Sequence, residues 1–295
     1  MRTFTLAFLL LPLPGWCQGP ANALLWRIEG QGLPEPSYVV GTVHSKDARA
    51  FRQVPQLLGV MQGRNAIAGE IDLTTGPPVT HLMADRLMLP AGKELGDFFT
   101  AKELRQVHKA LGAKMGPMAM MADRMKPFFL MAFLTEATMK ADSSMVLDQY
   151  LQVKAKEMGK EVLGLETVEE QLAAVDALPL QDQADMLYQT VRSGQDEKMM
   201  DRFLDAYAAQ DLGRLAKLVA NGNMPELMGE KLLKDRNRVM ANRMDSLMRG
   251  GRTILFAIGA AHLPSGGGVL DLLRGMGYQA TPMVEPHPAG VEGKH

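Results

Sequence analysis

Cysteine is nearly absent from this sequence, which has a single one, Cys17, among 295 residues. That cysteine lies in residues 1–23, where Arg2 precedes an apolar stretch over residues 6–13 and Ala21-Asn22-Ala23 supplies the small residues of a cleavage site. This arrangement is typical of a secretory signal peptide and predicts export, to the periplasm or out of the cell. The exported part then contains no disulfides and no thiolate metal ligands.

Long apolar runs and a charge bias are also lacking. Pro12, Pro14 and Gly15 interrupt the first apolar stretch well short of the roughly 18 residues that a membrane span needs, so we expect no stable span after cleavage. The formal net charge is −1, and the 32 lysines and arginines are scattered along the chain, which argues against a nucleic-acid partner. With 46% hydrophobic residues, the chain has enough apolar side chains for a sizeable globular core.

Six short apolar segments predict the strands of a central mixed sheet, over residues 24–28, 37–41, 66–72, 161–165, 253–259 and 279–284. They are apolar on both faces, which favours a sheet covered by helices on both sides. Between residues 73 and 159, and again between 168 and 249, apolar residues recur at helical spacing. The sequence therefore predicts an α/β (α+β-like) fold, with strands near both termini and large helical insertions.

Helix starts are marked inside these insertions. Thr100 with Glu103, and Thr167 with Glu170, have the spacing of capping boxes, and Pro127 marks a break or a start. The glycine- and proline-bearing residues 287–295 are expected to form a flexible tail.

Two Gly-x-x-His sequences follow apolar strands at comparable positions. One is Gly41-Thr42-Val43-His44, and the other is Gly259-Ala260-Ala261-His262. Ligands gather where the strands of an open α/β sheet end, and a glycine allows a turn or a close approach, so both imidazoles are candidates for a site. The alternative is that each histidine is a hydrogen-bonded core or loop residue. The similarity of the two segments also suggests an internal duplication.

Carboxylates follow two other predicted strands, at Glu70, Asp72 and Glu166. A carboxylate beside a buried strand loses hydration unless it is paired, protonated or bound to metal. Glu70 and Asp72 lie two residues apart, so within a strand they would share one face. The alternatives are that Glu70 pairs with a buried arginine or backbone amides, and that Asp72 and Glu166 cap the following helices.

Two imidazoles and one or two carboxylates, without a thiolate, form a donor set suited to divalent Zn, Mn, Co or Fe, which could activate water. A metal-free alternative uses one histidine as general base, an acid opposite it, and Arg236 as a clamp for an anionic group. Arg236 and Arg243 lie seven residues apart on one helix face. The alternative to a role in the site is that this face is simply exposed to solvent. Sequence spacing does not choose between these chemistries.

Taken in order, several segments resemble the TraB/GumN family over about residues 24–284. They are Leu25-Trp26-Arg27-Ile28, Tyr38-Val39-Val40-Gly41-Thr42-Val43-His44, Glu70-Ile71-Asp72, Lys126-Pro127, Leu163-Gly164-Leu165-Glu166-Thr167, Arg236-Asn237 and Ile258-Gly259-Ala260-Ala261-His262-Leu263. One departure is Val146-Leu147-Asp148, where members often have Gly-x-Asp. The resemblance implies one domain over residues 24–286, with a fold shared with erythromycin esterase-like (EreA) and haem-binding ChaN-like proteins.

The family includes the Tiki proteins, which are metal-dependent proteases. The resemblance implies that His44, His262 and Glu70 surround a divalent metal, Zn, Mn or Co. We therefore predict a periplasmic or secreted metal-dependent hydrolase directed at a peptide or small-molecule substrate, in which Glu166 assists proton transfer and Arg236 positions the substrate. The alternative is a non-catalytic protein that uses the same cleft to bind a peptide or haem.

Overall fold

A computed structural model of the chain describes residues 23–75, 85–192, 197–220, 225–264 and 266–284. The described residues form one sheet of six strands in the order β4-β3-β5-β2-β1-β6. The strands are β1 Leu25–Gly30, β2 Ser37–Thr42, β3 Ala66–Gly69, β4 Glu161–Gly164, β5 Ile254–Gly259 and β6 Tyr278–Pro282. β4, β3, β5 and β2 are parallel, whereas β1 is antiparallel to both β2 and β6. The predicted mixed sheet, drawn from both ends of the chain, is confirmed.

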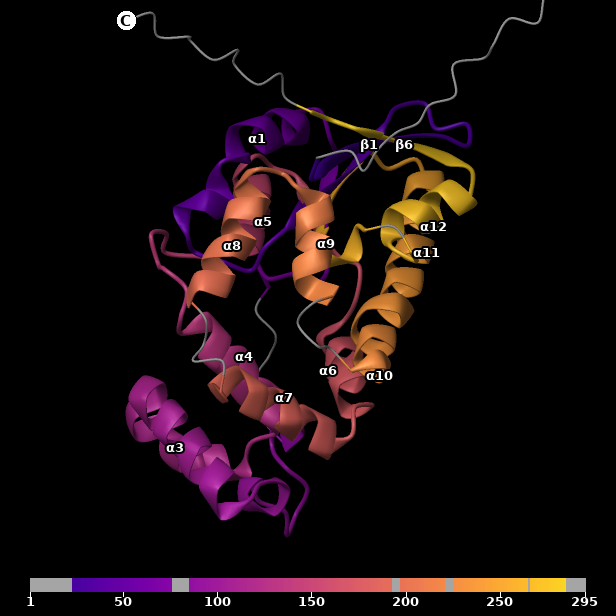
Figure 1. Cartoon of the computed structure of the whole chain (residues 1–295). Helices are drawn as coiled ribbons and strands as arrows, with labels where there is room; N and C mark the ends of the chain where they lie inside the picture. The colour runs from indigo at the N-terminus through magenta and orange to yellow at the C-terminus, as the bar shows by residue number, and fades with distance from the viewer. Residues whose placement is uncertain (1–22, 76–84, 193–196, 221–224, 265, 285–295) are drawn as a thin grey trace, which may run out of the picture.

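Helices cover both faces of this sheet, as its two-sided apolar character predicted (Figure 1). α1 (Val54–Gln62) and α5 (Leu147–Glu157) pack on one face, and α11 (Asp235–Arg249) and α12 (Val269–Gly275) pack on the other. Right-handed crossovers between parallel strands place them in this way, because the chain moves along the sheet in opposite directions before and after β4. Ile67 and Phe256 on the strands, and Met240 on α11, are completely buried in the resulting core.

Three further helices pack around a second core at the end of the molecule away from β1 and β6 (Figure 1). They are α3 (Ala101–Met115), α4 (Pro127–Glu136) and α7 (Leu180–Arg192). The described remainder consists of α6 Val168–Asp176, α8 Glu197–Ala208, α9 Leu212–Ala220, α10 Glu226–Gly229, a π-helical turn Glu230–Lys234, and the 3-10 segments Ala48–Phe51, Leu95–Phe98, Gly116–Arg124 and Ala260–His262. No helix among these residues is both long and apolar enough to cross a membrane.

The predicted helix starts are correct. Thr100 and Thr167 each accept a hydrogen bond from the backbone amide three residues on, with Glu103 and Glu170 completing the capping boxes. α4 begins at Pro127. The predicted signal peptide, apart from Ala23, and the predicted tail over residues 287–295 lie outside the described residues.

The predicted strand over residues 66–72 is too long, because β3 ends at Gly69. The carboxylate of Asp72 accepts hydrogen bonds from the amide and the hydroxyl of Thr74, and such a side-chain turn interrupts extended backbone. Glu70 and Asp72 therefore lie in the loop after the strand, where the two-residue alternation of side chains does not apply to them.

Candidate functional site

The carboxyl ends of four parallel strands meet at one edge of the sheet and bring the predicted site residues together. His44 follows β2, Glu70 follows β3, Glu166 follows β4, and His262 follows β5. Thr42 is the register partner of Gly259, and Gly69 is the partner of both Gly164 and Ala257. Segments separated by up to about two hundred residues in the chain thus share this edge, where open α/β sheets bind ligands.

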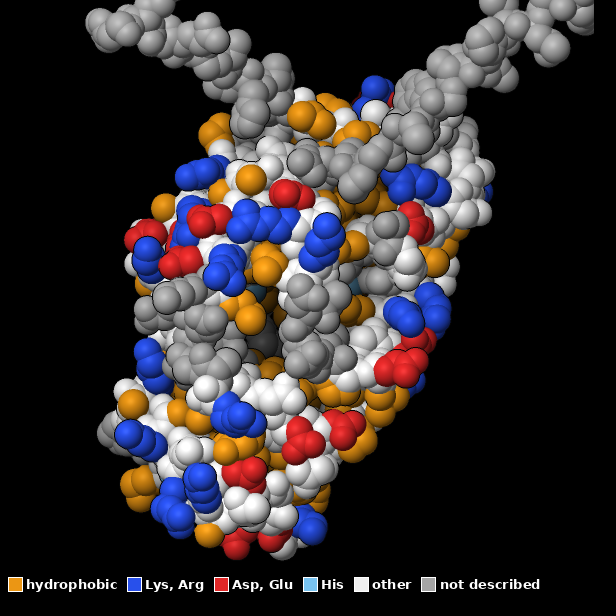
Figure 2. All heavy atoms as spheres, in the orientation of Figure 1, with side chains coloured by type: hydrophobic (Ala, Val, Ile, Leu, Met, Phe, Trp, Pro, Cys, Tyr) orange, Lys and Arg blue, Asp and Glu red, His pale blue; other side chains and the backbone are white. Residues whose placement is uncertain are grey.

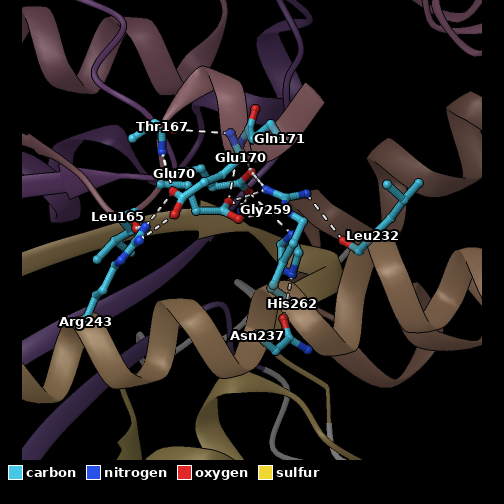
Figure 3. A network of polar contacts seen from close by, with 12 residues as sticks. Glu70, Leu165, Thr167, Glu170, Gln171, Leu232, Asn237, Arg243, Gly259 and His262 are labelled. Carbon is cyan, nitrogen blue, oxygen red and sulfur yellow. Dashed lines mark hydrogen bonds and ion pairs between the residues drawn. The ribbon is translucent and has the colours of Figure 1, made fainter. Parts of the chain in front are cut away.

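Figure 3 shows a network of polar contacts at this edge that includes Glu70, Gln171 and His262. Arg236 of α11 binds two carboxylates of this network. Its Nη2 atom lies 2.5 Å from Oε2 of Glu70 and 2.7 Å from Oε2 of Glu166. Its Nε atom donates to Glu166 over 3.0 Å, and its Nη1 atom donates to the carbonyl of Leu232. The side chain of Glu166 is only 2% exposed. The interpretation of Glu166 as a helix cap is wrong, because Thr167 caps α6 and Glu166 binds the guanidinium instead.

Glu70 is held at both of its carboxylate oxygens. Oε2 binds Arg236, while Oε1 accepts a hydrogen bond of 2.7 Å from the amide of Gly259. Burial opposes ionisation, but the electrostatic interactions with His262 and Arg236 and the hydrogen bond from the Gly259 amide outweigh it, so the pKa of Glu70 is lowered. One alternative for Glu70 was that it pairs with a buried arginine or with backbone amides. The structure contains both contacts. The carboxylate also faces His262.

The imidazole of His262 is oriented by Asn237 on α11. Nδ1 lies 2.6 Å from Oδ1 of Asn237, whose amide nitrogen donates to the carbonyl of Gly267 over 2.9 Å and so fixes which way the amide points. Nδ1 must therefore carry the proton. Nε2 lies 3.6 Å from Oε1 of Glu70. Burial lowers the pKa of His262 against the opposing effect of Glu70. When the ring is neutral with its proton on Nδ1, Nε2 turns a lone pair toward a carboxylate oxygen.

That contact between two electron-rich atoms has a chemical consequence. A lone pair facing a carboxylate is repulsive unless a positive charge lies between them, either a proton or a metal cation. A hydrogen bond from the distal ring nitrogen to a neighbouring carbonyl oxygen is how metal-binding histidines are commonly oriented. Asn237 provides such a carbonyl oxygen.

His44 has a different environment, defined by Asp148 in the first turn of α5. Oδ1 of Asp148 accepts a hydrogen bond from the hydroxyl of Thr42, while the buried Oδ2 has no hydrogen-bond partner and lies 3.5 Å from Nδ1 of His44. The side chain of His44 is 65% exposed. Asp148 raises the pKa of His44, although burial acts in the opposite direction. Sequence reasoning quoted Asp148 only as part of a motif departure and missed this role.

Glycine at two positions allows the two Gly-x-x-His loops to meet. A Cβ atom on Gly41 would lie 2.7 Å from Cδ1 of Leu263 and 3.0 Å from Cα of Ala260. A Cβ on Gly259 would lie 3.0 Å from Oε1 of Glu70. Neither glycine has a positive φ, so close approach and not backbone conformation requires them. The loops themselves differ, since only the second forms a 3-10 turn, and the duplication stays a prediction.

A polar hollow of about 290 Å³ opens at this edge between the sheet and α5. Its walls include His44, Glu70, Asp148, Gln152, Gln171 and Gly259. Gln171 donates to Glu70 and Glu166 over 3.3 and 3.4 Å, and Gln152 holds the loop after β3 through the carbonyl of Ile71. Arg243 lies apart from the hollow, because both of its Nη atoms bind Glu170.

The donor chemistry of this edge suits a divalent cation, with one neutral imidazole, a second imidazole and an ionised carboxylate. Across the described ranges, no three histidine, aspartate or glutamate side chains already stand as a ready metal-ligand set. Glu70 and His262 face each other, whereas His44 is turned toward Asp148.

The chain is thus an α/β protein with a six-stranded mixed sheet, and it gathers carboxylates, an arginine and two imidazoles at the ends of its parallel strands. A model of the TraB/PrgY/gumN family matches residues 24–282, and the chain belongs to this family.

Among curated proteins, the chain is 26% identical to Metalloprotease TIKI2 of Danio rerio, over 91% of this chain and 63% of the relative. It is 27% identical to Metalloprotease TIKI1 of Danio rerio, over 92% and 65%, and 26% identical to Metalloprotease TIKI1 of Homo sapiens, over 92% and 63%. The chain thus spans slightly less than two thirds of the length of these relatives. No solved structure matches the chain.

Proposed function

We propose that this protein is an exported, metal-dependent hydrolase that acts on peptides, with His44, Glu70 and His262 around the metal. The observation that carries the proposal is the contact of 3.6 Å between Nε2 of His262 and Oε1 of Glu70, in which a lone pair faces a carboxylate. Relatives of similar sequence are named metalloproteases, which supports the same chemistry. The metal is Zn, Mn or Co, because the donors are nitrogen and oxygen without sulfur.

A bound divalent cation would act as a Lewis acid toward a peptide carbonyl and toward water. The protein's own groups hold the geometry. Asn237 keeps the proton of His262 on Nδ1 and leaves Nε2 directed at the site. Asp148 sits beside Nδ1 of His44, so the other ring nitrogen is the one available to a ligand.

Arg236 and Glu166 act on Glu70. The Nε, Nη1 and Nη2 atoms of Arg236 all donate to groups of the protein, which favours a role in holding Glu70 ionised over direct positioning of the substrate. The buried carboxylate of Glu166 binds the same guanidinium as Glu70 does. We assign any proton transfer to a group that faces the polar hollow.

The purified chain is first dialysed against chelator. Calorimetric titration with Zn, Mn and Co then tests the proposal. We expect one equivalent to bind, and binding to be lost in His262→Ala and in Glu70→Gln. His108→Ala is the matched control, because His108 is an exposed histidine that pairs with Asp123 on the second core. Absence of binding by the folded parent would overturn the metal site.

Peptide-library cleavage is the second measurement. Turnover should disappear in chelator and return when the bound metal is restored. Stoichiometric metal binding without turnover of any peptide would identify a binding protein and reject the hydrolase.

A further inference from the structure

A second hollow, of about 380 Å³, lies on the other side of the second Gly-x-x-His turn. Its size is within the range of roughly 300–1,000 Å³ typical of ligand pockets. Its apolar walls come from three places, namely α8 with α9, the π-helical turn, and the Gly-x-x-His turn: Phe203, Leu215, Val219, Leu233, Ala260 and Ala261. Figure 2 shows hydrophobic side chains gathered in the depression in the middle of this face.

The polar groups in this lining already have partners within the protein. Asn237 uses Oδ1 for His262 and its amide nitrogen for the carbonyl of Gly267. The one charged residue of the described lining, Lys234, pairs with Glu230 over 3.3 Å. Among the described residues of the lining, the side chains of Asn237 and Lys234 are thus both engaged within the protein, and burying a polar or charged group against the apolar side chains would cost free energy. The lining selects a neutral, apolar group.

The apolar hollow and the polar hollow share one thin wall. Gly259 lines the polar side, whereas Ala260 and Ala261 line the apolar side. The ring of His262 stands in that wall, with Nδ1 directed at Asn237 of the apolar lining and Nε2 directed at Glu70 of the polar lining. Consecutive residues of one turn therefore line the two hollows.

We propose that the apolar hollow is a specificity subsite for a bulky apolar side chain of the peptide substrate, such as Phe, Leu or Met. This assignment rests on the proposed hydrolase function, and it adds the class of substrate. The occupant follows from three properties of the hollow, which are its apolar lining, the pairing of Lys234 with Glu230, and its position beside the turn that carries His262. The same properties disfavour an acidic or basic side chain at this position.

Binding of capped pentapeptides to the metal-free chain tests the subsite independently of turnover. A peptide with a central Phe should bind saturably and shift the amide resonances of Ala260 and Ala261, and a peptide with a central Glu should not. Ala216→Trp fills the hollow from α9, so it should weaken binding of the Phe peptide about tenfold or more. Lys217→Trp, at the exposed next residue of the same helix, should leave binding unchanged.

If Ala216→Trp does not fold, Ala216→Leu serves the same purpose with a smaller side chain. Equal binding of the Phe and Glu peptides, shifts confined to other parts of the chain, or unchanged affinity in a folded Ala216 variant would overturn the subsite. Where the enzyme turns over, Ala216→Trp should reduce cleavage beside Phe and retain cleavage beside Ala. If the Phe peptide binds as expected but the chain has no hydrolase activity, the apolar subsite is supported and only the hydrolase function is rejected.

Discussion

The two histidines of the paired motifs share a sequence pattern but differ in environment. The side chain of His262 is 5% exposed and that of His44 is 65% exposed. Burial lowers the pKa of the first, and Asp148 raises the pKa of the second. Titratable groups whose surroundings push their pKa values apart are suited to different tasks in one site. His262 is therefore the preorganised group, and His44 is the group that can move.

Asp148→Asn should lower the pKa of His44, because the variant removes the negative charge beside Nδ1. Proton NMR titration of the metal-free chain, following the ring signal of His44, measures the change. Asp123→Asn, which removes the carboxylate paired with His108, is the control and should leave the His44 titration where it is. An unchanged His44 pKa in Asp148→Asn would show that the 3.5 Å contact is not maintained in solution.

Asn237→Ala should weaken metal binding about 10- to 100-fold while the protein stays folded, because the ring of His262 loses the group that fixes its tautomer and direction. Calorimetric titration with the metal that the parent binds gives the ratio of dissociation constants. Asn242→Ala, at an exposed asparagine on the same helix, is the matched control. Parent-like affinity in Asn237→Ala would remove Asn237 from the site.

At the scale of elements, the first Gly-x-x-His loop depends on the absence of a side chain at Gly41. Gly41→Ala should destabilise the fold by about 1–3 kcal/mol, because the new methyl group would overlap Leu263 and Ala260. Gly112→Ala in α3 has open space around its new methyl and should be neutral or stabilising by up to about 1 kcal/mol. Urea denaturation of both variants compares them, and equal stabilities would contradict the close packing of the two loops.

The junction of α6 with α11 should make stability sensitive to acid. Hydrogen bonds from Arg243 and from the Thr167 amide lower the pKa of Glu170 from 4.5 to about 2. A lowered folded pKa gives stability that is present above pH 4.5 and is lost as pH falls toward 2. Because both side chains are 40% exposed, this contribution is about 1 kcal/mol or less.

The stability of Glu170→Gln should therefore fall less steeply than that of the parent as the pH is lowered through that window. Thermal unfolding at a series of pH values measures this slope. Glu169→Gln, one residue earlier and exposed, should keep the slope of the parent. If the two variants behave alike, the clamp between α6 and α11 does not form in solution.

The elements were largely predictable because their signals are local. The central strands are short apolar runs with polar or glycine boundaries, and each capping box needs only two residues three positions apart. The end of β3 was missed because the turn at Asp72 depends on the hydroxyl of Thr74, and apolar periodicity carries no information about it. The gathering of His44, Glu70, Glu166 and His262 at one edge was expected from the strand ends.

The partners of these residues were harder to predict, because each comes from a distant helix. Asp148 reaches Thr42 across 106 residues, and Asn237 reaches His262 across 25. A polar residue in the first turn of a helix is readily explained as a cap. A contact with a residue far away in the sequence is therefore not expected from its position. Only the packing of α5 and α11 on opposite faces of the sheet brings these side chains to the edge.

At the scale of the whole molecule, the site belongs to only one of two hydrophobic cores. The sheet and its covering helices form the larger core, and α3, α4 and α7 form the smaller one around Leu111, Leu130 and Leu187 (Figure 1). Most residues that line the two hollows lie on elements of the larger core or on the loops that leave it, whereas Gln171 lies on α6, which Lys126 and Gln183 join to the smaller core. We therefore expect a loss of stability in the smaller core to reach the site only through α6.

Leu111→Ala tests that separation. Leu111 is completely buried, so its truncation should lower the stability of the smaller core by about 2–5 kcal/mol. Amide hydrogen exchange should accelerate in α3, α4 and α7, while the amides of β2 and β5 and the metal affinity stay as in the parent. Leu255→Ala is at an equally buried position on β5. It should accelerate exchange in β2 and β5 instead of α3, α4 and α7, and it should weaken metal binding. Faster exchange in β5 of Leu111→Ala would mean that the two cores unfold as one cooperative unit, and the helical end would then be part of what holds the site together.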